Sequence, residues 1–244
     1  MIDIPIQRVG YGFPDDLMPM PDYWQLSTER GINHPSTVLD QADDFDKEYL
    51  VIRMSASIKR QVADALPKLK TVRFLEIDAY VIPQEVIDRL QDMPQLERLA
   101  LAPTRTKDLD FLEQLPNLNY LSLESIPNVA DLGPVIGRKN LLSLVLGTSA
   151  ADLEAIQKGS LPNLRCLVLS GTGESKPARF PSLEPLRNLQ NLEYLCLLNC
   201  RAEDKSLRFA LSLPKLKKLH LYSARPWNKD DIATLMQAGV SVTR

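Results

Sequence analysis

The chain has 244 residues, of which 44% are hydrophobic and 25% charged, a composition typical of a globular protein. Its net charge of -2 and pI of about 5.8 argue against a nucleic-acid binder that depends on bulk positive charge. No apolar run approaches the ~18 residues of a membrane span, the first residues lack a secretory signal, and the three cysteines have no disulfide or zinc spacing. We therefore expect a cytoplasmic chain without a membrane segment, metal or cofactor.

The first 65 residues are irregular. Ile2, Ile4 and Ile6 alternate as they would in a strand. Residues 10–47 hold four prolines and seven aspartates, together with the aromatic side chains Tyr11, Phe13, Tyr23, Trp24 and Phe45. Residues 49–54 are typical of a strand, and the apolar residues spaced four apart over 58–66 predict a helix after it.

The pattern Leu-Pro-x-Leu-x-x-Leu-x-Leu recurs from residue 66 onward. Its seven copies begin at Leu66, Met93, Leu115, Arg138, Leu161, Leu189 and Leu213, in steps of 22 to 28 residues. All 21 of its later leucine positions are apolar, and 19 of them are leucine. Because Leu-x-Leu has the period of a strand, each copy predicts one short strand. The predicted strands span residues 71–75, 98–102, 120–124, 143–147, 166–170, 194–198 and 218–222.

Over residues 66–225 the chain resembles the leucine-rich repeat family, with irregular repeats of mixed length. The resemblance implies an α/β solenoid, a curved horseshoe with a parallel sheet on its concave face and short helices or turns on its convex face. The family usually has Asn or Cys three residues after the last leucine, where the side chain satisfies amides of neighbouring coils. Here that position holds Ile77, Thr104, Ile126, Ser149, Thr172, Cys200 and Ala224, so only some repeats keep this hydrogen bonding.

The segments between the strands differ in their helical signal. Residues 83–90, 151–156 and 204–211 place apolar side chains on one helical face. Residues 108–112 and 182–186 are shorter and predict single turns. The convex side is therefore expected to mix helical repeats with shorter ones, and irregular repeats without cysteine-rich caps favour a bacterial origin.

Both ends of such an array need caps, because a repeat solenoid otherwise exposes its core. We expect residues 1–65 to form an N-terminal cap with a degenerate first repeat, 66–225 to form seven repeats, and 226–244 to form a C-terminal cap. In the C-terminal cap, Asn228 is expected to begin a helix that Gly239 ends, before an edge strand at 240–242. The buried face of that helix would be Ile232, Leu235 and Met236.

Residues 1–47 have two interpretations. They are either a cap whose aromatic side chains lie over the open core, or an acidic, aromatic arm that contacts a partner. Charge also differs between the two ends: residues 1–65 carry 11 acidic and 6 basic side chains, whereas residues 201–244 carry 4 acidic and 9 basic ones. The solenoid is thus polarised from end to end.

The residues between the leucines of each strand should face outward on the concave sheet, since side chains alternate along a strand. Their middle and later part is low in charge and holds three tyrosines, a composition typical of a protein-binding surface. The expected partner-binding residues there are Tyr120, Val145, Val168, Tyr194, Cys196, Leu198, His220 and Tyr222. Val168 is expected to stay in contact with water at the centre of this face.

Residues 171–181 form an insertion that lengthens the fifth repeat, and we expect a loop there whose Lys176 and Arg179 offer a further, weaker contact for a partner. The two histidines, His34 and His220, are far apart and have no metal or nucleophile spacing, so we expect no catalytic residue. Residues 1–65 and 222–244 contain no cysteine, which favours a reducing compartment.

The sequence therefore predicts a non-enzymatic, cytoplasmic scaffold-type module that binds a partner protein on its concave face, without nucleic acid or membrane. A sharper alternative is a cytoplasmic inhibitor or immunity-type protein that occludes an enzyme or toxin, its association assisted by the charge polarity. An alternative of another class is an enzyme with its site in residues 1–47.

Overall fold

A computed structural model of the chain describes residues 39–40, 42–101, 103–123, 126, 129, 131–147, 150–158, 160–171, 177–222 and 227–243. The expectations for Ile2 to Ile6, for most of residues 10–47, and for His34 and Lys176 lie outside these residues. Among the described residues no helix is both long enough and apolar enough to cross a membrane.

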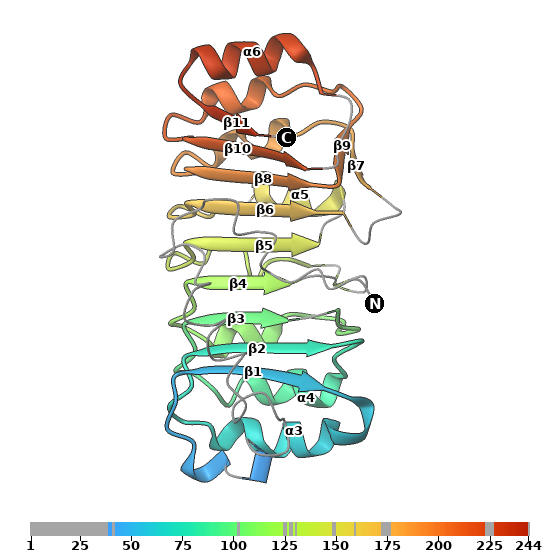
Figure 1. The fold of residues 1–244 in the computed structure, drawn as a ribbon, viewed down its shortest axis with the longest axis vertical. Coiled ribbons are helices and arrows are strands. Elements are labelled where there is room, and N and C mark those ends of the chain that lie inside the picture. The colour runs from blue at the N-terminus through green and yellow to red at the C-terminus, as the bar shows by residue number, and fades with distance from the viewer. Residues whose placement is uncertain are drawn as a thin grey trace.

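A nine-stranded sheet runs the length of the molecule, in the order β1-β2-β3-β4-β5-β6-β8-β10-β11 (Figure 1). Every neighbouring pair in it is parallel. Its strands are β1 (Tyr49–Met54), β2 (Phe74–Ala79), β3 (Arg98–Leu101), β4 (Tyr120–Leu123), β5 (Ser143–Gly147), β6 (Cys166–Ser170), β8 (Tyr194–Leu198), β10 (Lys218–Tyr222) and β11 (Ser241–Thr243). The predicted α/β leucine-rich repeat solenoid is confirmed.

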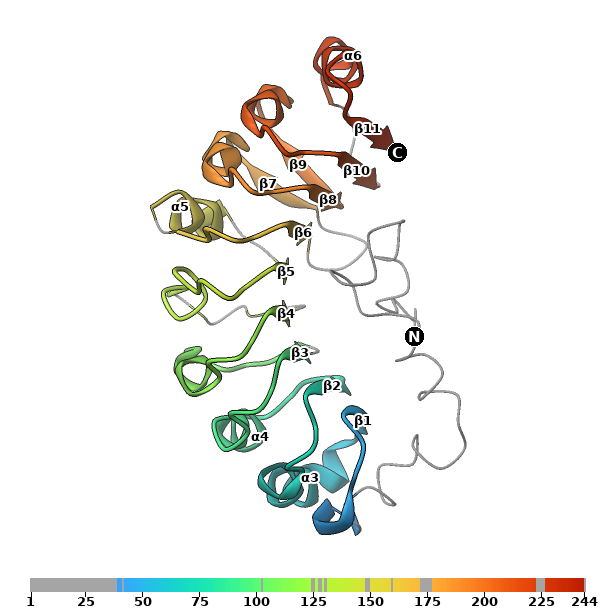
Figure 2. The ribbon, with the colours of Figure 1, turned by 90° about the vertical axis from the view of Figure 1, so that its left-hand side faces the viewer.

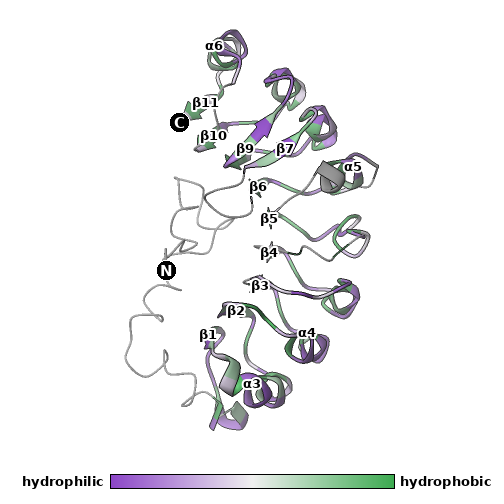
Figure 3. Ribbon diagram, turned by 90° about the vertical axis from the view of Figure 1, so that its right-hand side faces the viewer, coloured by the Kyte–Doolittle hydropathy of each residue, from purple (hydrophilic) through white to green (hydrophobic). Residues whose placement is uncertain are grey.

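Short helices line the other side of the sheet, so that strands form the inner side of an arc and helices its outer side (Figure 2). The α-helices are α3 (Lys59–Ala65), α4 (Gln84–Leu90), α5 (Ala150–Lys158) and α6 (Lys229–Gln237). The 3-10 helices are η2 (Ala42–Asp44), η3 (Ala56–Ile58), η4 (Leu66–Lys68), η5 (Asp110–Gln114), η6 (Glu184–Asn188) and η7 (Arg208–Ser212). In Figure 3 the outer helices carry much of the hydrophilic colouring.

The predicted convex elements are confirmed with one difference. Helices α4 and α5 cover the segments predicted to be helical at 83–90 and 151–156, and η5 and η6 are the expected single turns. The segment 204–211, however, forms only the five-residue 3-10 helix η7. A single short turn already buries Leu207, Phe209 and Ala210, so a longer helix adds no apolar contact there.

In the first regular repeat, the core-facing residues of strand β2 lie three residues later in the chain than the sequence pattern predicted. Leu75 pairs with Leu99, and Ile77 pairs with Leu101. Leu75 and Ile77 are therefore the two residues of β2 that face the core. The prediction of a strand at residues 71–75 is wrong. Phe74 consequently faces outward, where the guanidinium carbon of Arg98 lies 4.6 Å from the centre of its ring.

Two further strands were not predicted. β7 (Ala178–Phe180) and β9 (Cys200–Ala202) pair in parallel beside the main sheet, with Arg179 opposite Arg201. The expectation of a loop at 171–181 is thus wrong for its last residues, because Ala178 and Phe180 are buried in the core while Arg179 points into solvent.

Hydrogen bonds between neighbouring coils hold the stack in register. In the Leu-Pro-x-Leu segment, Asn117 donates to the carbonyl oxygen of Pro94, and Asn140, Asn163 and Asn191 repeat the bond one coil further on, at 2.6 to 3.1 Å. At the family position three residues after the last leucine, Thr104 and Cys200 form such hydrogen bonds. Thr104 Oγ1 donates to Ile82 O at 3.2 Å, and Cys200 Sγ donates to Leu169 O at 3.3 Å.

The C-terminal residues cover the last coil. The Asn228 side chain accepts hydrogen bonds from the N–H groups of Asp230 and Asp231, and α6 begins there. Gly239, with a φ of +89°, follows the helix, and β11 pairs with β10. Ile232 and Leu235 are buried as expected, whereas Met236 is 58% exposed, so its expected burial is wrong.

At the first coil, β1 extends the sheet beyond β2, and α3 packs beside α4 on the convex side. Val62 and Leu66 are fully buried. One continuous apolar core then fills the space between the sheet and the outer helices, from Ala42 to Val240.

Candidate functional site

The outward side of the sheet carries a second apolar cluster, separate from the solenoid core. It consists of Ala100, Tyr120, Val145, Cys166, Val168 and Cys196, with the partly buried Leu142, Tyr194 and Leu198 packed against it. We call this set the concave cluster. The strand register explains it: Val145, Val168 and Cys196 are paired partners in the middle row of β5, β6 and β8, and each lies between two inward-facing leucines.

The structure brings together most of the predicted partner-binding residues. Six of the eight belong to the concave cluster or pack against it: Tyr120, Val145, Val168, Tyr194, Cys196 and Leu198. The other two, His220 and Tyr222, lie on β10, where their rings stack with centroids 6.2 Å apart. Arg179, on β7, lies outside the main sheet.

Leu142 belongs to the cluster but was not among the predicted residues. It immediately precedes β5, at a position where the other repeats hold Glu97, Asn119, Arg165, Glu193 and Lys217. An apolar residue at a repeat position that is otherwise polar indicates burial, and this could have been recognised from the sequence.

The concave cluster is sealed from solvent, which the sequence did not predict. Val168, Cys166 and Cys196 are 0% exposed, although their strand positions alternate with those of the core leucines. At the start of the same sheet, by contrast, the outward side chains of β1 are half-buried at Tyr49 and Val51 and exposed at Arg53. The expectation that Val168 stays in contact with water is therefore wrong.

Burial also sets the chemistry of the cysteines. It raises the pKa of the Cys196 and Cys200 thiols to about 12 and raises the pKa of Cys166 further. Because the thiolate is the nucleophile, these neutral thiols are poor candidates for covalent catalysis. Among the described residues, no three His, Cys, Asp or Glu side chains gather into a possible metal site.

An ionic triad borders the concave cluster along the edge where β6, β8 and β10 begin. Glu193 accepts from Arg165 Nε at 2.7 Å and from Lys217 Nζ at 2.6 Å. These two hydrogen bonds lower the pKa of the Glu193 carboxyl to about 2. Lys217 Nζ also lies 5.9 Å from the centre of the Tyr194 ring, so the triad positions an aromatic side chain of the cluster.

His220 lies at the far end of the middle row, opposite Cys196 on one side and Thr243 on the other. Its Nδ1 is 2.5 Å from Thr243 Oγ1. Burial, together with the nearby Lys218, lowers the pKa of the imidazole. The histidine is therefore neutral at pH 7 and adds no charge to this end of the face.

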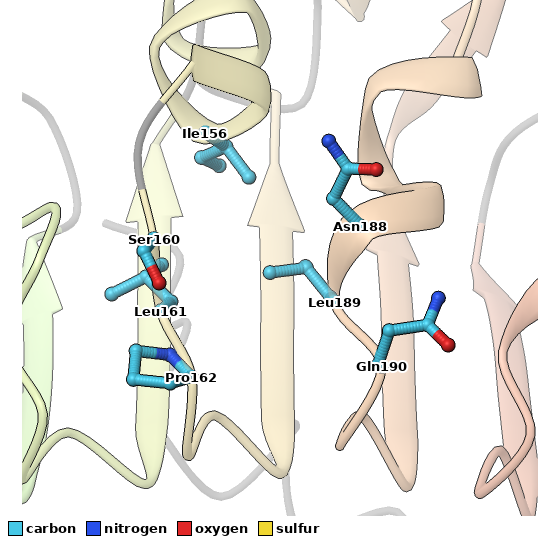
Figure 4. A pocket seen from close by; sticks show the side chains of 7 residues that line it. All are labelled: Ile156, Ser160, Leu161, Pro162, Asn188, Leu189 and Gln190. Carbon is cyan, nitrogen blue, oxygen red and sulfur yellow. The ribbon is translucent and has the colours of Figure 1, made fainter.

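A pocket of about 260 Å³ lies on the convex side, between α5 and η6 (Figure 4). It is lined by Ile156, Ser160, Leu161, Pro162, Asn188, Leu189 and Gln190. The lining contains no ionisable group, and the Asn188 amide already donates to Gln157 O at 3.3 Å. The pocket therefore offers neither a general acid nor a base that could activate the Ser160 hydroxyl, and we do not regard it as an active site.

No family model matches the chain. Solved structures with the same architecture include an internalin from Listeria monocytogenes, with a TM-score of 0.55 and 17% identity over 96% of this chain and 66% of that one. Another is internalin C2 from the same organism, with a TM-score of 0.50 and 16% identity over 94% and 95% of the two chains. At this identity the likeness shows the fold, so the chain is a leucine-rich repeat solenoid.

A sequence relative is a Trypanosoma equiperdum protein named an adenylate cyclase regulatory protein, which is 30% identical over 158 residues. The match covers 62% of this chain but only 24% of that protein. The chain thus corresponds to about a quarter of the length of this relative.

Proposed function

We propose that this chain is a non-enzymatic protein-interaction module that binds a partner protein through its concave face. The observation that carries the proposal is the concave cluster itself. It joins apolar side chains from five neighbouring strands, β3 to β8, on the side of the sheet that faces away from the core. An apolar cluster that includes Tyr120 and contacts Tyr194 has the composition of binding hot spots, which are rich in aromatic residues.

The size of the face supports a protein partner rather than a small molecule. The steps from β2 to β10 span ~30 Å at ~4.8 Å per strand, comparable with the footprint of a standard protein interface. The charged groups lie around the cluster, in the Arg165–Glu193–Lys217 triad and at Arg98. An apolar centre with a charged rim is the usual arrangement of such interfaces.

A more specific role, inhibition of an enzyme or toxin, has support in the polarity of charge. The difference between the acidic first 65 residues and the basic last 44 would speed association with an oppositely polarised partner. The name of the trypanosome relative also refers to regulation of an enzyme. We propose this role second, and we likewise propose a cytoplasmic location.

Site-specific crosslinking in the source cell tests the binding face. A photoreactive benzoylphenylalanine replaces Tyr194 in one variant and Tyr80 in the other. Tyr194 belongs to the concave cluster, whereas Tyr80 is 95% exposed and lies beyond the end of β2. We expect a protein adduct from position 194 that position 80 does not give. Equal adducts from both positions, or adducts from position 80 alone, would move the binding face away from the concave cluster.

A further inference from the structure

The sealed concave cluster requires a layer of atoms above it. A side chain that projects from the centre of an open sheet has neighbours beside it but water above its tip. Val168, Cys166 and Cys196 have no such contact with water. The small polar side chains Ser122 and Ser143 on the same face are also buried, at 1% and 0% exposed. A cover therefore extends over β4, β5, β6 and β8.

The described elements do not supply this cover. Each of their strands lies in the main sheet or in the β7–β9 pair beside it, and their helices lie on the outer side of the arc or at its ends (Figure 2). Outside the described residues, residues 1–38 form the one long stretch, and every other stretch has five residues or fewer. Each of these short stretches, the single terminal residue Arg244 apart, joins described residues of its own coil at both ends, so it cannot leave that coil to cross four strands. We propose that residues 1–38 dock on the concave cluster of their own molecule.

The point of attachment and the length of this segment allow it to reach. Leu39 and Phe45 pack against the solenoid core, and Lys68 Nζ pairs with Asp43 at 3.0 Å, which fixes the start of the described chain beside the first coil. The centre of the cluster on β6 is five strand steps from β1, or ~24 Å. A random-coil chain of 38 residues has an average end-to-end distance of ~35 Å, so a segment of this length is long enough to reach the cluster.

The composition of the segment also matches the surface. It contains Tyr11, Phe13, Tyr23 and Trp24, with Ile2, Ile4 and Ile6 near its start. It carries five acidic and two basic side chains. From β3 to β10, the charged side chains at the described outward strand positions are Arg98 and Lys218, and both are cationic. Aromatic side chains on an apolar face, with acidic groups beside two cations, make a complementary pair.

Docking in cis has a consequence that rests on the proposed function. A tethered segment is present at an effective concentration in the millimolar range. A partner protein would bind only the fraction of molecules whose concave face is free, and its apparent affinity would fall by that fraction. The segment 1–38 would then act as an internal competitor for the partner site.

Photo-crosslinking in the purified, intact chain tests the docking without any partner. Benzoylphenylalanine replaces Tyr194 or, in a second variant, Leu198, both of which are half-buried at the edge of the concave cluster. The control position is Tyr80. We expect crosslinks from positions 194 and 198 to peptides within residues 1–38 of the same molecule, at a yield that does not depend on protein concentration. Crosslinks between two molecules, or crosslinks that do not involve residues 1–38, would overturn the proposal.

A second variant of the intact chain examines the aromatic contacts. Replacing Tyr23 and Trp24 by serine should lower the crosslink yield from position 194 by roughly tenfold, since aromatic side chains are common anchors. Tyr80→Ser should leave this yield unchanged. Because both experiments use the isolated protein, their failure would refute docking in cis while leaving partner binding to be judged by crosslinking in the cell.

Discussion

Leu167 and Val168 are consecutive residues of β6, both fully buried, yet they belong to different apolar clusters. Leu167 packs into the core between the sheet and the outer helices, whereas Val168 lies in the concave cluster on the opposite side. The middle of the sheet is thus buried on both faces, as is usual for parallel sheets. How a partner protein binds therefore depends on what covers the concave face.

Leu167→Ala should destabilise the solenoid by about 2–5 kcal/mol, because it removes buried methyl groups and leaves a cavity in the core. The measurement is the free energy of unfolding in urea. Leu211→Ala is the matched control, since Leu211 is 45% exposed, and it should change this free energy by no more than ~0.5 kcal/mol. A cost below ~1 kcal/mol for Leu167→Ala would mean that Leu167 does not lie in a packed core.

Replacing either Leu167 or Val168 by glutamate distinguishes the two faces of the sheet more clearly than alanine does. Leu167→Glu places a charge in the core, where it has no route to water, and should prevent folding. Val168→Glu should still fold, because the docked segment 1–38 that we propose can be displaced, and the charge then contacts water. The loss of stability is limited to the free energy with which that segment docks. Circular dichroism during thermal melting compares the two variants. If both fail to fold, the concave cluster is a fixed part of the core.

The ionic triad predicts a dependence of stability on pH. The pKa of Glu193 is lowered from 4.5 to about 2 in the folded chain, so the folded state favours the charged form. This stabilisation is complete above about pH 4.5 and is lost as the pH falls toward 2. Glu193→Gln should cost about 1–3 kcal/mol at pH 7 and flatten the stability profile between these values. The exposed Glu184, paired with Arg187 at 2.8 Å, supplies the control Glu184→Gln, which should leave the profile unchanged.

Asp231 ties the C-terminal cap to the preceding coil. Its carboxylate accepts from Leu207 N at 2.9 Å, from Ser206 Oγ at 3.1 Å and from Arg208 Nε at 3.1 Å. Burial alone would raise the pKa of Asp231, but these hydrogen bonds outweigh it and the pKa is lowered. Asp231→Ala should cost about 2–4 kcal/mol, because the Leu207 N–H loses its partner inside the protein.

Urea unfolding measures this cost, with Asp230→Ala as the neighbouring control. Asp230 is exposed, and its side chain makes none of these three contacts. Equal costs for the two substitutions would show that the charge near the start of α6 matters, and that the contacts to the preceding coil do not.

The repeat pattern predicted six of the seven strand registers, because Leu-x-x-Leu-x-Leu occurs once in each of those coils. It failed in the first repeat, where Val72-Arg-Phe74 and Leu75-Glu-Ile77 both have the period of a strand. Only pairing with Leu99 and Leu101 decides between them. Strand β7 could not be predicted for the same reason, because it forms only by pairing with β9, some 20 residues away in the chain.

The outward orientation of the concave residues followed from alternation along each strand, but their burial did not. Orientation is a local property of the backbone, whereas exposure depends on what lies above the sheet. Val168 and Cys196 are small residues suited to any strand, so neither indicates a cover by itself. Leu142, the apolar exception in a polar column, was the one available sign that this edge of the face is buried.

Thiol reactivity in the native, intact chain tests most directly whether the concave face is closed. Cys196 lies in the concave cluster, whereas Cys200 lies in the core and serves as an internal reference. Alkylation followed by peptide mapping gives a rate for each cysteine. We predict that Cys196 is protected to the same extent as Cys200, at least ~100-fold relative to the unfolded chain. Reaction of Cys196 at the unfolded rate while Cys200 stays protected would contradict the account, since it would show a concave face open to water.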